Sequence, residues 1–93
     1  MDEIQVIVLI NGQTIISRIA AVVSELGEPD CKLINPYQIV DGKLTSWLSE
    51  LTDATDAIMI SSDKILTLVD PKETLLNDYL TLTQWSFTQV YFN

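Results

Sequence analysis

The sequence predicts a small, mainly β domain in which five antiparallel strands bend into a barrel and a short C-terminal helix follows them. Three observations predict this fold. The chain has 93 residues, enough for one domain. Its apolar residues fall in short runs, rich in β-branched side chains, that are bounded by turn residues. One run is long enough to bend, and closing a small sheet into a barrel removes its exposed edges.

The first two runs form a predicted hairpin. Residues 4–10 (IQVIVLI) are almost all β-branched or Leu and end at Asn11-Gly12, a strong signal for a two-residue hairpin turn. Residues 14–24 (TIISRIAAVVS) continue the β-branched composition as a long second strand. The turn cluster at residues 27–30 (GEPD) then ends this strand.

The remaining strands are shorter. Residues 31–40 (CKLINPYQIV) contain Pro36, which cannot donate a ladder hydrogen bond and so predicts a bulge, a bend or an edge position. Residues 57–62 (AIMISS) and 65–69 (ILTLV) complete the five strands. Between them and the third strand, residues 41–56 are expected to form a long polar loop. Its large apolar anchors are Trp47, Leu48 and Leu51.

A helix start follows the last strand. Asp70 is placed as the N-cap, Pro71 as the first helical residue and Glu73 as the capping-box partner. The helix is predicted from residue 71 to about residue 80. Its apolar stripe consists of Leu75, Leu76, Tyr79 and Leu80.

The last 13 residues, 81–93 (TLTQWSFTQVYFN), are interpreted as an aromatic C-terminal tail outside a domain of residues 1–80. Trp85, Phe87 and Tyr91 are evenly spaced, as on one face of a strand. Such a strand would be exposed unless it finds a partner.

Composition excludes several classes of function. Five basic against 13 acidic residues give a net charge of -8, so the molecule as a whole repels phosphate. Without histidine there is no Ser-His, Cys-His or His-metal chemistry, and the single Cys31 forms no internal disulfide. There is no apolar run of about 18 residues, and the acidic start lacks the basic region of a signal peptide. We therefore expect a cytoplasmic protein without membrane contact, cofactor, metal or enzymatic activity.

Two acidic groups are candidate sites. Glu25, Glu28 and Asp30 could hold a hard cation through oxygen atoms, but their spacing matches no calcium loop and favours a solvated turn. Asp53 and Asp56 could do the same or act as an acid–base pair, and a merely polar loop is again favoured. Cys31 is interpreted as a small core residue.

Several strands are apolar on both faces, which predicts burial against another subunit. The outward residues of this kind are taken to be Ile7, Leu9, Ile16 and Val22. Arg18 lies on a strand otherwise nearly devoid of charge, so we expect it to pair with a carboxylate across a subunit boundary. Trp47 and Trp85 are interpreted as packing anchors of the subunits or of the tail.

A family resemblance rests on five segments in their order and spacing. They are residues 8–16 (VLINGQTII), 33–36 (LINP), 47–48 (WL), 60–65 (ISSDKI), and 70–71 (DP) with 75–79 (LLNDY). With them the chain, over residues 4–80, resembles the Sm-like (LSm) proteins, and within these the small uncharacterised Sm-like proteins of cyanophages and marine phages. The resemblance implies a strongly bent, five-stranded SH3-like barrel, located in the host cytoplasm if a phage encodes it.

The resemblance also implies a homo-oligomeric ring of five to seven subunits. In that family the fourth strand of one subunit pairs with the fifth strand of the next, and a closed ring leaves no free sheet edge. The strands concerned here are residues 57–62 and 65–69. The expected interface residues are Ile58, Ile60, Leu66 and Leu68.

The family's RNA-binding positions are altered. Asp30 and Asn35 lie near the positions of its Asp and Asn, but with a different spacing and with Pro36 where an apolar residue is usual. Ser61 and Ser62 replace its Arg-Gly pair, which removes a charge for phosphate and a planar group that stacks on bases. The family's usual N-terminal helix is also missing.

Two functions therefore remain open. The first is a non-enzymatic, ring-forming assembly or scaffold protein, whose acidic charge would suit a basic protein partner. The second is a ring that binds single-stranded RNA weakly through Asn35, Tyr37 and Lys64.

Overall fold

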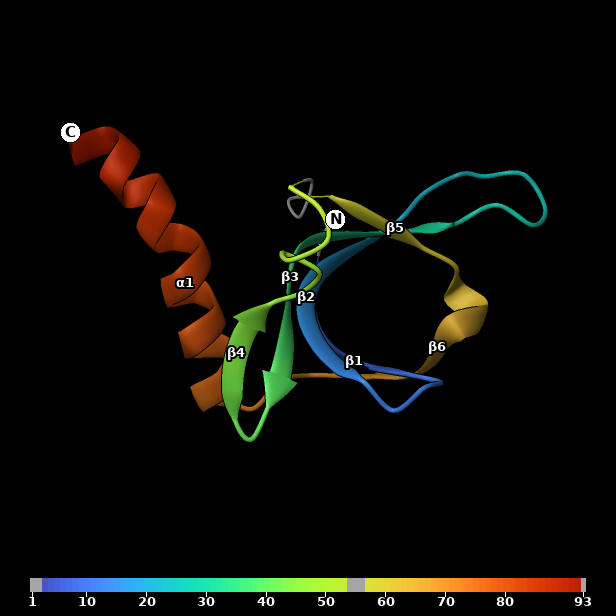
Figure 1. The fold of residues 1–93 in the computed structure, drawn as a ribbon, viewed down its shortest axis with the longest axis horizontal. Helices are drawn as coiled ribbons and strands as arrows, with labels where there is room; N and C mark the ends of the chain where they lie inside the picture. Colours follow the sequence, from blue (N-terminus) through green and yellow to red (C-terminus); the bar gives the residue numbers. More distant parts are fainter. Residues whose placement is uncertain (1–2, 54–56, 93) are drawn as a thin grey trace.

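In the computed structural model the backbone is described for residues 3–53 and 57–92, and side chains are described up to residue 83. Six strands form one antiparallel sheet that curls round on itself, and a single long helix follows it (Figure 1). The strands are β1 (Glu3–Leu9), β2 (Thr14–Ala21), β3 (Cys31–Val40), β4 (Lys43–Ser46), β5 (Ile58–Ile60) and β6 (Ile65–Val69). A mainly β fold built on a bent antiparallel sheet is thus confirmed.

The strand order places β5 and β6 at two ends of the sheet. The path runs β4-β3-β2-β1-β6, and β5 pairs with β3. Strand β5 pairs with residues 31–33 of β3, whereas β4 pairs with residues 37–40 of the same strand. Although β5 and β6 are joined only by the 3-10 helix η1 (Ser62–Lys64), they do not pair with each other.

Strand β4 corrects the prediction of a long loop at residues 41–56 and raises the strand count from five to six. Asp41 and Gly42 both have positive φ, 52° and 75°, as a two-residue type I′ hairpin turn requires. The turn brings Lys43 opposite Val40. The Asp-Gly signal was therefore a hairpin signal, and the polar composition of the short strand concealed it.

The predicted irregularity at Pro36 is confirmed as a bulge between β2 and β3. The register shifts between Ile16 and Arg18, and Asn35 has a φ of 53°. A bulge leaves backbone groups without ladder partners. Ser17 meets part of this need, because its buried hydroxyl lies within hydrogen-bond distance of the carbonyls of Arg18 (2.8 Å) and Ile34 (3.1 Å).

The core lies inside the curled sheet. Its buried cluster consists of Ile7, Leu9, Ile15 and Leu33, and half-buried residues that pack on it are Ile19, Trp47, Ile60 and Ile65. The interpretation of Ile7, Leu9 and Ile16 as outward residues waiting for a subunit is wrong, since all three are buried within one chain. Ile7 and Leu9 point inward, and Ile16 lies on the sheet face to which the C-terminal helix is attached.

The C-terminal helix is longer than predicted. Helix α1 (Glu73–Phe92) has 20 residues, so residues 81–92 continue the helix and do not form a strand. The even spacing of three aromatic residues was misleading. Residues 73–92 include neither Gly nor Pro, and each residue added to an established helix gains a backbone hydrogen bond at little cost.

The far end of α1 leans away from the sheet (Figure 1). The side chains of Trp85, Phe87 and Tyr91 lie outside the described residues, and so does the predicted anchoring role of Trp85. Within the described part of the chain, no helix is both long and apolar enough to cross a membrane.

Candidate functional site: the open ends of the sheet

Among the described strands, β5 and β6 each have a partner along one edge only. Strand β6 pairs with β1, with Ile7 opposite Leu68 and Val6 opposite Val69. Its other edge meets no strand that the structure describes. Strand β5 likewise pairs only with β3 among the described strands. A free edge of this kind presents backbone donors and acceptors to another chain.

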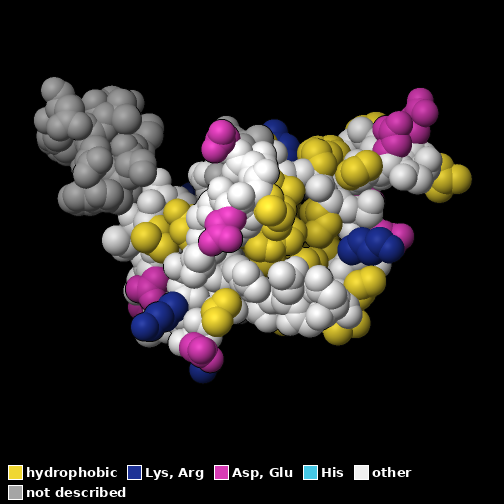
Figure 2. Space-filling view, viewed as in Figure 1, with side chains coloured by type: hydrophobic (Ala, Val, Ile, Leu, Met, Phe, Trp, Pro, Cys, Tyr) yellow, Lys and Arg dark blue, Asp and Glu magenta, His cyan; other side chains and the backbone are white. Residues whose placement is uncertain are grey.

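The open ends are also apolar. On β6, Leu66 is 68% exposed and Leu68 is 45% exposed, and on β5 Met59 is 45% exposed. Figure 2 shows apolar side chains gathered near the middle of the face that looks into the curled sheet. Unpaired backbone and exposed apolar side chains therefore coincide at these ends, a combination typical of surfaces that contact another protein.

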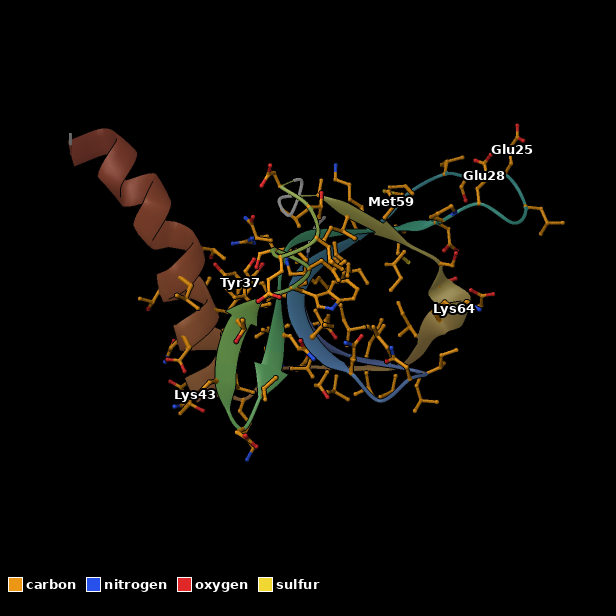
Figure 3. The ribbon with its side chains drawn as sticks, in the orientation of Figure 1. Glu25, Glu28, Tyr37, Lys43, Met59 and Lys64 are labelled. Carbon is orange, nitrogen blue, oxygen red and sulfur yellow. The ribbon has the colours of Figure 1, made fainter. Side chains whose placement is uncertain are left out.

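The four expected interface residues are not equally accessible. Leu66 and Leu68 are exposed, whereas Ile58 and Ile60 are half-buried and Ile60 packs on the core. Met59, labelled in Figure 3, is the exposed side chain of β5, and the sequence reasoning missed it. Alternation along a strand could have found it, because neighbours of an inward residue point outward.

Asp30 fastens the turn between the two open strands to the start of β3. Its two carboxylate oxygens accept hydrogen bonds from the hydroxyl and the backbone N–H of Ser62, both at 2.7 Å. These bonds, the hydroxyl bond first, hold the pKa of Asp30 below its ordinary value. Asp30 and Ser62 lie at two of the positions that the family resemblance relates to RNA binding. Here they contact each other, and the contact holds the turn in place.

The acidic groups do not form a metal site in the described part of the chain. Glu25 and Glu28 are exposed on the loop between β2 and β3 (Figure 3), and Asp30 is engaged with Ser62. No cluster of three or more metal-binding side chains occurs among the described residues. Asp56, one half of the second acidic pair, lies outside them.

The three candidate RNA-binding residues are not brought together. Tyr37 packs edge-on against Tyr79 of α1, with ring centroids 5.9 Å apart. Asn35 lies two residues earlier, in the bulge of β3. Lys64 ends η1 and lies well away from Tyr37 on the other side of the curled sheet (Figure 3).

Tyr79 attaches α1 to the sheet, a role that the sequence reasoning did not assign. The side chain is fully buried, and its hydroxyl donates to the carbonyl of Ile34 at 2.9 Å and accepts from the N–H of Arg18 at 3.1 Å. These are backbone groups beside the bulge. Burial raises the pKa of Tyr79, so its hydroxyl stays protonated and able to donate.

Cys31 is not an activated nucleophile. The thiol is half-buried, and burial, followed by the negative charge of Asp30, raises its pKa. A raised pKa lowers the thiolate fraction on which cysteine reactivity depends.

These features define the class of the protein: a small bent β-sheet domain with a long C-terminal helix and two apolar sheet ends that lack a second partner among the described strands. The sequence matches, over residues 2–84, the family described as "Family of unknown function (DUF6561)", and the chain belongs to this family. The comparison with curated proteins gives no match.

Proposed function

We propose that the protein is a subunit of a homo-oligomeric ring of five to seven copies and that this ring is a non-enzymatic, cytoplasmic assembly scaffold of the Sm-like type. One observation carries the proposal. Within the part of the chain that the structure describes, β6 is unpaired along one edge and exposes its leucines, and β5 offers a second free edge.

Two different free edges favour a head-to-tail contact. When β5 of one copy pairs with β6 of the next, each contact uses one edge of each kind, and a rotation that closes leaves none unpaired. Fully burying an exposed leucine contributes about 2 kcal/mol, so Leu66 and Leu68 supply part of the driving force.

The net charge indicates which kind of partner such a ring would bind. A subunit of net charge -8 attracts a basic protein and repels the phosphates of RNA. The residues considered for RNA also lie apart, with Tyr37 engaged by Tyr79. Both points favour a protein partner over RNA.

Native mass spectrometry of the protein, purified without nuclease, tests the proposal. We expect one species of five to seven subunits with no additional mass. Leu66→Asp should yield monomers that keep the wild-type far-ultraviolet circular dichroism spectrum, because the change places a charge at the pairing edge. Leu51→Asp is the matched control, since Leu51 is 82% exposed in the loop between β4 and β5.

A monomeric wild-type protein, or an intact ring of the Leu66→Asp variant, would contradict the proposed interface. A ring that carries oligonucleotide mass would instead favour RNA binding and would direct mutagenesis to Asn35, Tyr37 and Lys64.

A further inference from the structure

A cavity of about 460 Å³ opens between β1, β2 and the beginning of α1. Arg18 is the only basic residue among the described residues of its lining. The other lining residues are Glu3, Ile4, Gln5, Asp70, Pro71 and Leu76. The lining therefore combines aliphatic side chains with a guanidinium, an amide and two carboxylates.

The guanidinium of Arg18 has no partner among the described residues. No ion pair or hydrogen bond holds it there, although two carboxylates line the same cavity. Asp70 instead accepts a hydrogen bond from the side-chain amide of Gln5 at 2.9 Å. The backbone N–H of Arg18 is bound to Tyr79, so the residue is fixed in place while its charged group remains unpaired.

The surroundings of Arg18 are mainly apolar in the sheet. The residue is half-buried, and in the sheet it lies opposite Ile4 on one side and Ile34 on the other. A charge that is partly withdrawn from water gains free energy from a partner, because its hydration is reduced. An anion that enters the cavity would supply the missing partner.

We propose that the Arg18 cavity binds a carboxylate carried on an aliphatic body. The planar guanidinium matches a carboxylate with two parallel hydrogen bonds, and Ile4, Pro71 and Leu76 suit an aliphatic chain. Glu3 and Asp70 repel a phosphate group more strongly than a carboxylate, since a phosphate group carries about -1.5 to -2 charges at neutral pH. The carboxylate belongs either to a small aliphatic acid or to a polypeptide, such as a neighbouring copy.

Isothermal titration calorimetry with sodium butyrate at constant ionic strength tests whether the carboxylate belongs to a small aliphatic acid. We expect saturable binding of butyrate, no binding of its neutral analogue butyramide, and weaker binding of inorganic phosphate. Arg18→Met should weaken butyrate binding at least about tenfold, as expected for the loss of a charge-assisted pair. Lys43→Met removes a basic residue of β4 that does not line the cavity (Figure 3), and should leave binding unchanged.

If Arg18→Met does not fold, Arg18→Lys takes its place in the titration. It keeps the charge but loses the two-pronged geometry, so butyrate binding should weaken about threefold. Unchanged affinity in Arg18→Lys, or phosphate binding as tight as butyrate binding, would overturn the proposal.

Native mass spectrometry of the same variants tests whether the carboxylate belongs to a neighbouring copy of the chain. If a neighbouring copy already fills the cavity, butyrate will not bind, but Arg18→Met will raise the concentration at which the assembly dissociates about tenfold, and Lys43→Met will not. Absence of both effects would overturn the proposal. A monomeric wild-type protein would refute the proposed ring. The butyrate titration alone would then decide whether the Arg18 cavity binds a carboxylate.

Discussion

Ile7 and Leu68 face each other across the β1–β6 ladder, yet their environments differ completely. Ile7 is fully buried and Leu68 is 45% exposed. Strand β1 lies between β2 and β6, whereas β6 has a described strand on one side only. The difference shows that a hydrogen-bonded ladder alone does not bury a strand, because burial also needs a neighbour or a covering layer.

Helix α1 supplies such a layer at the centre of the sheet. Its Tyr79 is fully buried beside the β2–β3 bulge, and Ile16 in the same region is fully buried as well. By contrast, four of the five residues of β6 are exposed. The centre of the sheet is therefore buried within one chain, whereas the β6 end is largely exposed.

The largest expected effect separates these two regions directly. Ile7→Ala should lower the free energy of unfolding by about 3 kcal/mol, because it leaves a cavity in the core. Leu68→Ala should cost less than about 1 kcal/mol in a dilute single chain, since the side chain is already partly hydrated. Urea unfolding of both variants at low protein concentration gives the comparison, and equal losses would show that β6 is as well packed as β1.

A smaller effect is expected where the helix meets the sheet. Tyr79→Phe should cost about 1–2 kcal/mol, because in a buried place the N–H of Arg18 loses its partner and the carbonyl of Ile34 loses one of its two. Tyr37→Phe is the matched control. It also removes a tyrosine hydroxyl, but the edge-on contact with Tyr79 is made by the ring and is kept. The anchoring role would be wrong if the two variants unfolded at the same urea concentration.

The smallest effect concerns the contact that fastens the β5–β6 turn to the centre. The folded-state pKa of Asp30 lies below its ordinary value of 3.8, so its stabilising contribution is complete above that value and is lost as the pH falls through the lower folded-state pKa. Melting temperatures between pH 6 and pH 2 should therefore fall less steeply for Asp30→Asn than for the wild type.

Asp63→Asn is the control for this titration, because Asp63 is exposed in η1 close to the same turn. A wild-type acid profile that Asp30→Asn leaves unchanged would mean that the Ser62 contact contributes nothing in solution.

Local patterns predicted most of the strands but not the contacts between distant residues. The β-branched runs and the Asn11-Gly12 turn located β1 and β2, and Pro36 marked the bulge. Strand β4 was missed because its four residues are mostly polar, although Asp41-Gly42 carried the hairpin signal. The end of α1 was missed because a spacing of two in a few aromatic residues is a weak indicator of a strand.

The candidate site was predictable only in part. Leu66 and Leu68 were found from the expected edge strand, and their exposure agrees with an accessible edge. The role of Tyr79 depends on a carbonyl 45 residues away in the sequence, and that of Asp30 on Ser62, 32 residues away. Such contacts follow from the way the sheet curls, which no local pattern specifies.

Hydrogen exchange of the backbone amides of β6 tests most directly whether another copy covers the open end of the sheet. The measurement compares residues 65–69 with β1 at high and at low protein concentration. We expect protection of β6 to approach that of β1 when the protein is assembled and to fall selectively on dilution. Rapid exchange of β6 at every concentration, with β1 protected throughout, would contradict the account, because it would show that the free edge stays unpaired.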